Sequence, residues 1–369
     1  IKMSKRPSIF DYAKKELSQD AMICWLLDCC HSDDSTYMNI GLDFIKFILE
    51  DESISESDIE LEKDSPHAQY HRMDVYASIR VGNEIIPVIF EDKTNTFLHE
   101  DQEARYTEMV NSWKNDEKWT KGLFDNDKLK WSKKTMYVFF KTGYVFDWQK
   151  EEMKCIKEKL NAKVKTIYID DMLEFIARHK HKDFLLDDYY EYLTKRKSEL
   201  VGSMEDKCNR YFNKIFGDKK RFSYHYQQWA ARNFGYIQDE SQKGENIIYC
   251  AVRTGWRKNA YSIAVQQYRN EKTLFGNNEE KKLLVEKRYV ITDETIDICK
   301  KVAVDLADDL GVEINFENNI KNKMPSQRNL FRVFIDDDNE EKVCSFFREF
   351  IKKFNKLAKD KYKEQYVVC

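Results

Sequence analysis

Two carboxylates and a lysine stand at positions from which they could cut a phosphodiester. Asp74 opens one apolar stretch, and Glu91 and Lys93 close the next. Two carboxylates can hold a hard cation such as Mg²⁺, which keeps several of its waters in a protein site. The cation lowers the pKa of a water, while a neighbouring Lys can orient that water or neutralise charge that develops on the phosphate. These residue types predict a metal-dependent site for phosphodiester hydrolysis.

Residues 72–106 predict the elements that position this set, a β-hairpin that leads into a helix. Residues 75–81 are rich in β-branched and aromatic side chains, and residues 85–90 are nearly all apolar. Gly82-Asn83 between them suits the positive φ angles of a tight turn. The second stretch has the composition of a strand that is buried on both faces.

Alternation along the second strand decides which charges can meet. Glu91 and Lys93 face one side of the strand and Asp92 faces the other, while Asp74 on the paired strand can face the first two. We expect metal ligands from Asp74 and Glu91, with Asp92 as a further candidate, and Lys93 as the catalytic amine. The alternative is a solvated hairpin end that carries ordinary surface charges.

These residues resemble the PD-(D/E)XK nuclease superfamily, with Asp74 as the first acid and Glu91-Asp92-Lys93 as the E-x-K element. The stretch Gln102-Glu103-Ala104-Arg105-Tyr106 resembles the Q-x-x-x-Y element of the RecB-like branch. Glu16, just before an apolar helix, resembles the acidic residue that opens the same core. The chain departs from the family motif at Met73, which precedes Asp74 where the motif has a Pro.

The resemblance implies a restriction-endonuclease-like αβββαβ core, with a central mixed sheet flanked by helices, over residues 8–175. It also implies a nuclease that prefers DNA and uses Mg²⁺, with Mn²⁺ as a substitute, in genome defence, repair or mobile-element biology. Glu16 would be an extra catalytic carboxylate. A solvent-facing charge near a helix start is the alternative for that residue.

Leu98, Gln102, Tyr106, Met109 and Trp113 recur at helical spacing and define one helix face. The functional interpretation is that Gln102 hydrogen-bonds near the metal centre and Tyr106 contacts nucleic acid. The alternative is a helix that a buried amide and a buried phenol fix to the sheet.

The 369 residues are enough for two domains, and 42% hydrophobic with 34% charged residues is typical of globular proteins. We expect an α/β nuclease domain over residues 1–200 and an α+β, mostly antiparallel domain over residues 201–369, joined near residues 201–203. In the first domain we expect helices at 21–26, capped by Ser18, and at 38–49 and 150–160, with strands at 59–62, 136–140 and 166–169. In the second we expect helices at 205–215, 226–234, 294–310 and 339–359, and strands at 247–253, 261–267, 283–291 and 331–335.

Charge is distributed unevenly along the chain. The net charge is −3, but residues 201–290 hold 17 Lys and Arg against 10 Asp and Glu, a net of +7. Arg253, Arg257 and Lys258 cluster at an expected hairpin with Gly255, where they could hold the phosphates of a nucleic acid. A solvated hairpin tip is the alternative.

Nine cysteines are scattered without a C-x-x-C pair, and no secretory signal is present, so we expect a reducing cytoplasm. No apolar run reaches membrane-spanning length, so no membrane partner is expected.

The sequence therefore predicts a divalent-metal-dependent deoxyribonuclease. Two alternatives stay open: a nucleic-acid-binding protein that kept the fold but lost cleavage, and a nuclease gated by a ligand or protein bound to residues 201–369. The second domain could also pair with another copy of the chain.

Overall fold

The computed structural model of the chain divides into two compact units, Ile1–Ser203 and Met204–Cys369. The division lies at the linker expected near residues 201–203. The structure describes residues 8–11, 15–94, 96–98, 101–115, 123–124, 129–225, 229–238, 246–257, 260–269, 279–316 and 327–368.

The first unit is built on a mixed seven-stranded sheet. Five strands run in the order β1-β3-β4-β6-β7, with β2 beside β3 and β5 beside β4. The β1, β3 and β4 strands pair antiparallel, whereas β4, β6 and β7 pair parallel. The strands are β1 (Ile59–Leu61), β2 (His67–Tyr70), β3 (Met73–Val81), β4 (Glu84–Lys93), β5 (Lys130–Trp131), β6 (Thr135–Lys141) and β7 (Ala162–Tyr168).

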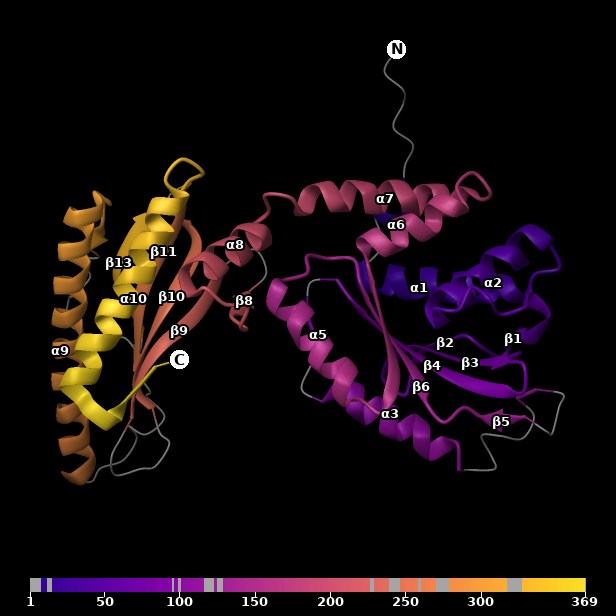
Figure 1. Cartoon of the computed structure of the whole chain (residues 1–369), viewed down its shortest axis with the longest axis horizontal. Helices are drawn as coiled ribbons and strands as arrows, with labels where there is room; N and C mark the ends of the chain where they lie inside the picture. Colours follow the sequence, from indigo (N-terminus) through magenta and orange to yellow (C-terminus); the bar gives the residue numbers. More distant parts are fainter. Residues whose placement is uncertain are drawn as a thin grey trace, which may run out of the picture. The chain divides into compact units, whose positions relative to one another are not determined.

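Helices cover both faces of this sheet (Figure 1), so the unit is a mixed α/β structure. The α1, α2, α6 and α7 helices share one core with side chains of β3, β4 and β6, including Val75, Phe90 and Val138. The α3 and α5 helices contact the strands from the other face. The helices are α1 (Lys15–Asp28), α2 (Ser35–Leu49), α3 (Gln102–Trp113), α5 (Asp147–Lys159), α6 (Ile169–Arg178) and α7 (Phe184–Leu200), with short 3-10 turns at Ile9–Asp11, Cys29–His31 and Glu56–Asp58.

The predicted hairpin is present. The β3 and β4 strands pair from Val75 opposite Phe90 to Val81 opposite Glu84. Gly82 closes the turn at φ +59°, a conformation that glycine adopts without steric cost. Since β4 lies between β3 and β6 and is covered on both faces, its charged end is enclosed by protein.

One local expectation in this unit is wrong. The α1 helix begins at Lys15, so Ser18 lies inside the helix and is not its N-cap. The short β2 strand, which begins at His67, pairs with β3.

The second unit has an antiparallel sheet in the order β12-β13-β11-β10-β9-β14, with β8 beside β9. The α10 helix contacts α8, α9 and β9, and its phenylalanines, including Phe347 and Phe350, pack on Phe331 of β13. The elements are α8 (Met204–Phe216), β8 (Ser223–His225), β9 (Trp229–Gln238), β10 (Asn246–Arg257), β11 (Ala260–Arg269), α9 (Glu279–Leu310), β12 (Asn315–Phe316), β13 (Gln327–Phe334), α10 (Glu340–Tyr362) and β14 (Tyr366–Val368), with a 3-10 turn at Lys363–Gln365.

Three expectations for the second unit are corrected. Residues 229–234 belong to β9 rather than to a helix, because β9 pairs with β8, β10 and β14. Residues 283–291 continue α9 rather than forming a strand. The expected hairpin is present as the antiparallel β10–β11 pair, but Gly255 lies inside β10 opposite Ser262 rather than in a turn.

Among the described helices, none combines the length and the apolar run that crossing a bilayer requires.

Gly143 provides a test of how tightly the end of β4 is packed. A Cβ at this position would overlap the Thr94 carbonyl, directly after Lys93. We expect Gly143→Ala to displace the Thr94 backbone and to lower the free energy of unfolding by about 1–3 kcal/mol, as overpacking does. Urea unfolding measures the loss.

Gly82→Ala is the matched control. Its Cβ would meet open space, so only the strained φ +59° costs energy, roughly 1–2 kcal/mol. If Gly143→Ala were as stable as the wild type, the close approach to Thr94 would not constrain this strand end.

Candidate functional site

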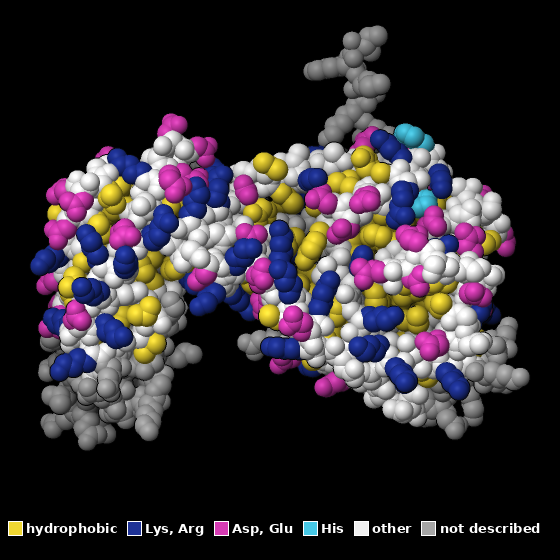
Figure 2. All heavy atoms as spheres, in the orientation of Figure 1, with side chains coloured by type: hydrophobic (Ala, Val, Ile, Leu, Met, Phe, Trp, Pro, Cys, Tyr) yellow, Lys and Arg dark blue, Asp and Glu magenta, His cyan; other side chains and the backbone are white. Residues whose placement is uncertain are grey.

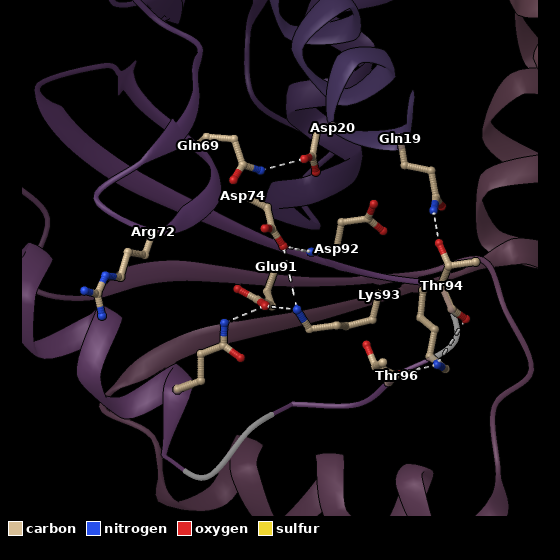
Figure 3. Close-up of polar contacts among 12 residues, drawn as sticks. Gln19, Asp20, Gln69, Arg72, Asp74, Glu91, Asp92, Lys93, Thr94 and Thr96 are labelled. Atoms are coloured by element: carbon tan, nitrogen blue, oxygen red, sulfur yellow. Dashed lines mark hydrogen bonds and ion pairs between the residues drawn. The ribbon is translucent and has the colours of Figure 1, made fainter. Parts of the chain in front are cut away.

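Asp74, Glu91 and Lys93 come together at one end of the β3–β4 pair. The Lys93 ammonium forms an ion pair with Glu91 Oε1 and lies 3.9 Å from Asp74 Oδ2. Asp74 precedes the pair formed by Val75 and Phe90, so it lies opposite Glu91 on the antiparallel partner strand. Figure 3 shows the two carboxylates and the ammonium turned toward one another.

These charges are not a solvated hairpin end. Glu91 is 0% exposed, Asp92 is 1% exposed and Lys93 is 9% exposed, while Asp74 is half-buried. Charged side chains are buried in this way only when they are paired, bound to a metal or shifted in pKa. The alternative of ordinary surface charges is therefore wrong for these residues.

Glu91 is satisfied at only one of its two oxygens. Oε1 accepts from Lys93 and, at 2.7 Å, from the Gln102 side-chain amide. Oε2 is buried and has no hydrogen-bond partner among the described residues. Burial therefore raises the pKa of Glu91 from 4.5 to about 7, against the opposing pull of Lys93, and Asp74 adds to the rise.

Gln102 and Tyr106 link α3 to this set. The Gln102 amide also donates to the Tyr106 hydroxyl at 3.1 Å, and that hydroxyl donates to the Arg72 carbonyl at 2.6 Å. Because the two residues are one helical turn apart, they present both groups on one face of α3. Gln102 thus meets the predicted carboxylate, as its functional interpretation requires.

Tyr106 is not available for the predicted contact with nucleic acid. Its side chain is buried, and its hydroxyl is engaged by Gln102 and Arg72. The geometry favours the alternative interpretation, in which the phenol fixes α3 to the sheet.

Asp92 is not brought to Asp74 and Glu91, although its backbone N–H donates to Asp74 Oδ2 at 2.8 Å. Strand alternation turns its carboxylate to the α1 side of the sheet, as Figure 3 shows. There its charge helps to raise the pKa of the buried Tyr189 on α7. The predicted role of Asp92 as a ligand beside Glu91 is not supported by this arrangement.

The remaining predicted site residues are not joined to this set by the structure. Glu16 lies in α1, but its side chain is outside the described part. Arg253 lies inside β10 in the second unit, where its guanidinium stacks on Trp229 at 4.8 Å. The Arg257 side chain and Lys258 lie outside the described residues.

Positive charges in the second unit are partly used within it. Arg210 and Lys214 each form an ion pair with Glu340 at 2.8 Å, and the buried Arg232 pairs with Asp218. Figure 2 shows one face of this unit, on which basic and acidic side chains are interspersed. The surplus of positive charge in residues 201–290 is therefore partly neutralised by carboxylates of the same unit.

Sequence reasoning missed two polar residues of β6 beside the site. The Lys141 ammonium is buried and donates to the Thr96 carbonyl at 2.6 Å and to the Thr94 carbonyl at 3.4 Å, which fixes the segment after Lys93. Tyr137 is buried with a hydroxyl that has no partner in the described part of the chain. Burial, together with the nearby Glu91, holds the pKa of the Tyr137 hydroxyl well above its ordinary value. The pairing register of β6 with β4 places Lys141 and Tyr137 beside the site, and the sequence alone does not show that register.

The donor set fits a Mg²⁺ ion. The described residues hold no group of three or more His, Cys, Asp or Glu side chains arranged around a metal. Mg²⁺ needs fewer protein ligands, because it keeps several waters and binds through one or two carboxylates together with substrate phosphates. Asp74 and Glu91, whose Oε2 has no partner in the described part of the chain, are two such carboxylates.

No protein-family model, no curated protein and no solved structure matches the chain. The functional argument therefore depends on the geometry of the site and on the resemblance of its motifs.

The raised pKa of Glu91 gives a prediction for the metal-free protein. Between pH 4.5 and about 7 the folded state binds more protons at this carboxyl than the unfolded state does. The free energy of unfolding should therefore fall as pH rises through this window, by up to about 3 kcal/mol for this one group. Denaturant unfolding with a chelator, across this pH range, measures the fall.

Glu91→Gln is the control, because it keeps the shape and removes the titration. The difference between wild type and variant cancels every other titrating group. A variant with the same pH dependence as the wild type would show that Glu91 titrates normally.

Proposed function

We propose that the chain is a divalent-metal-dependent nuclease that hydrolyses phosphodiester bonds, with DNA as the preferred substrate. The observation that carries the proposal is a set of two carboxylates and one lysine, in which Glu91 and Lys93 are buried and Glu91 Oε2 has no partner among the described residues. The DNA preference, and a role in defence, repair or mobile-element biology, follow from the resemblance to PD-(D/E)XK nucleases.

The order of elements supports the finer fold assignment. A helical layer, then β1, β3 and β4, then α3 and then β6 follow one another in the order that an αβββαβ core requires. The antiparallel β3–β4 pair and the parallel β4–β6 pair form its mixed sheet. We therefore infer a PD-(D/E)XK core in which β3 carries Asp74 and β4 carries Glu91 and Lys93.

In this proposal Asp74 and Glu91 hold the cation, which when bound supplies Lewis acidity to the phosphate and to an attacking water. Lys93 places a positive charge beside both carboxylates, where it can stabilise negative charge that develops on the phosphate. Gln102 holds Glu91 Oε1 in place through a 2.7 Å hydrogen bond. Tyr106 and Lys141 fix the segments on either side of the set.

Cleavage assays with single-stranded DNA, duplex DNA and RNA, each with Mg²⁺, Mn²⁺ or a chelator, test the proposal. We expect cleavage that needs the metal and favours DNA. Asp74→Asn and Glu91→Gln should each lower the rate by at least about 100-fold, since each removes a negatively charged ligand.

Glu60→Gln is the matched control. Glu60 is also an ion-paired carboxylate, 2.6 Å from Arg80, but it lies on β1 beside the far end of β3. Its loss should leave the rate within about twofold of the wild type, because surface ion pairs contribute little. Full activity in a folded Glu91→Gln variant would remove this site from the reaction.

Lys93→Met separates catalysis from binding. One lysine among many adds little to total phosphate affinity, but a charge beside the phosphate acts on the transition state. We expect turnover to fall by about 100-fold or more while the affinity for DNA, measured with Ca²⁺ in place of Mg²⁺, changes by less than about threefold. If affinity fell in step with the rate, Lys93 would be a substrate anchor.

A further inference from the structure

Next to the proposed site lies a cluster of aromatic rings that the chemistry above does not use. We define the ring platform as Tyr70 and His71 at the β2–β3 turn, together with Trp113 at the end of α3. Ring centroids are 4.5 Å apart for Tyr70 and His71, 5.2 Å for His71 and Trp113, and 5.8 Å for Tyr70 and Trp113. His71 is exposed, and Tyr70 and Trp113 are half-buried.

The platform is continuous with the proposed site. Trp113 rests on Tyr76 with ring centroids 5.5 Å apart, and Tyr76 is two residues from Asp74 on the same face of β3. Two residues along a strand span about 7 Å. Trp113 also follows Gln102 and Tyr106 along one face of α3, so one helix carries both the Glu91 contact and the platform.

The β2–β3 turn is held in place from both faces of the sheet. The Arg72 carbonyl accepts from Tyr106 of α3, and Gln69 donates to Asp20 of α1 at 2.8 Å. Such a turn presents its side chains in a fixed arrangement, which lowers the entropy that binding would cost.

The turn residues themselves are costly for a purely structural hairpin. His71 and Arg72 of the turn have φ angles of 50° and 72°, and Gln69 of the adjoining β2 has a φ of 52°, all in the left-handed region that disfavours them. A two-residue turn chosen for stability has Asn-Gly or a similar pair, whereas this one exposes an imidazole and a guanidinium. Figure 3 shows the Arg72 side chain turned away from Asp74 and Glu91.

We propose that the ring platform and Arg72 hold an unpaired nucleotide next to the phosphate that is cleaved. The exposed His71 ring stacks with the base, Tyr70 and Trp113 support that ring from the protein side, and Arg72 contacts a neighbouring phosphate. A paired base inside a duplex does not expose its face, so the substrate is single-stranded or locally unpaired. This inference deepens the proposed nuclease function and depends on the same site.

Fluorescence anisotropy with labelled oligothymidylate and with the matching duplex, in the presence of a chelator, tests the platform without cleavage. His71→Asn removes the ring and keeps a residue that tolerates positive φ. We expect about tenfold weaker binding of the single strand, with an unchanged dependence on salt, because stacking releases no counterions. Duplex binding should be weaker than single-strand binding in the wild type and insensitive to the substitution.

Two further variants separate the contributions. Arg72→Asn should flatten the slope of log affinity against log salt by about 0.7, as expected for one phosphate contact to a single strand. Trp113→Leu should weaken binding as His71→Asn does, and Trp113→Phe should restore much of it, provided that thermal unfolding shows both to be folded.

His225→Asn is the matched control, because His225 is also exposed and stacks on a tryptophan, Trp229, at 5.7 Å in the second unit. An equal loss from this control, unchanged binding in His71→Asn, equal losses for duplex and single strand, or no binding by the wild type would each overturn the platform. Ring-dependent binding without metal-dependent cleavage would keep the platform and reject the nuclease. Metal-dependent cleavage at an unchanged rate in the ring variants would keep the nuclease and reject the platform.

Discussion

A carboxylate that is buried with one oxygen unbonded costs free energy, and Glu91 is such a group. Its Oε1 has two donors, Lys93 and Gln102, while its Oε2 has no partner in the described part of the chain. The rise of its pKa to about 7 expresses that cost. A cation at Oε2 would offset this cost, and that is the position where the proposed chemistry needs a ligand.

The surrounding structure keeps Glu91 in this unfavourable state. The β4 strand cannot move toward solvent, because β3 and β6 pair with it on both sides and helices cover both faces. Two residues fix the segment that follows Lys93. Lys141 donates to the Thr94 carbonyl, and Gly143 lies so close to that carbonyl that a side chain would not fit between them. Stability lost at one carboxylate is thus balanced by packing and backbone hydrogen bonds elsewhere.

The sequence predicted the parts of the site that depend on local rules. Strand alternation placed Glu91 and Lys93 on one face and Asp92 on the other, and helical spacing aligned Gln102 with Tyr106. Partners that come from distant segments were not predictable. The register that brings Lys141 and Tyr137 beside β4, and the ring contacts of Trp113 with the β2–β3 turn, depend on strand pairing and helix docking rather than on local pattern.

The wrong elements have the same origin. Residues 283–291 contain β-branched side chains, but they follow the helix formers Glu and Lys, and a helix that has begun extends cooperatively. Residues 229–234 lack alternation, yet they pair with neighbouring strands to form β9, because strand formation depends on its partners more than on intrinsic preference. Tertiary pairing decides both cases, and a single sequence does not show it.

The charge distribution suggests how an acidic unit could bind a polyanion. Residues 1–200 hold 31 Lys and Arg against 39 Asp and Glu, so the net negative charge of this unit repels a polyanion at the proposed site. In the second unit Arg210, Lys214 and Arg232 are occupied by carboxylates of the same unit. Affinity for the proposed substrate would then come from contacts that need little net charge, namely ring stacking at the β2–β3 turn and a cation that Asp74 and Glu91 would hold. Both contacts are short-ranged, so they favour substrates whose bases and phosphates can reach the site together, which an unpaired strand does more readily than a stacked duplex.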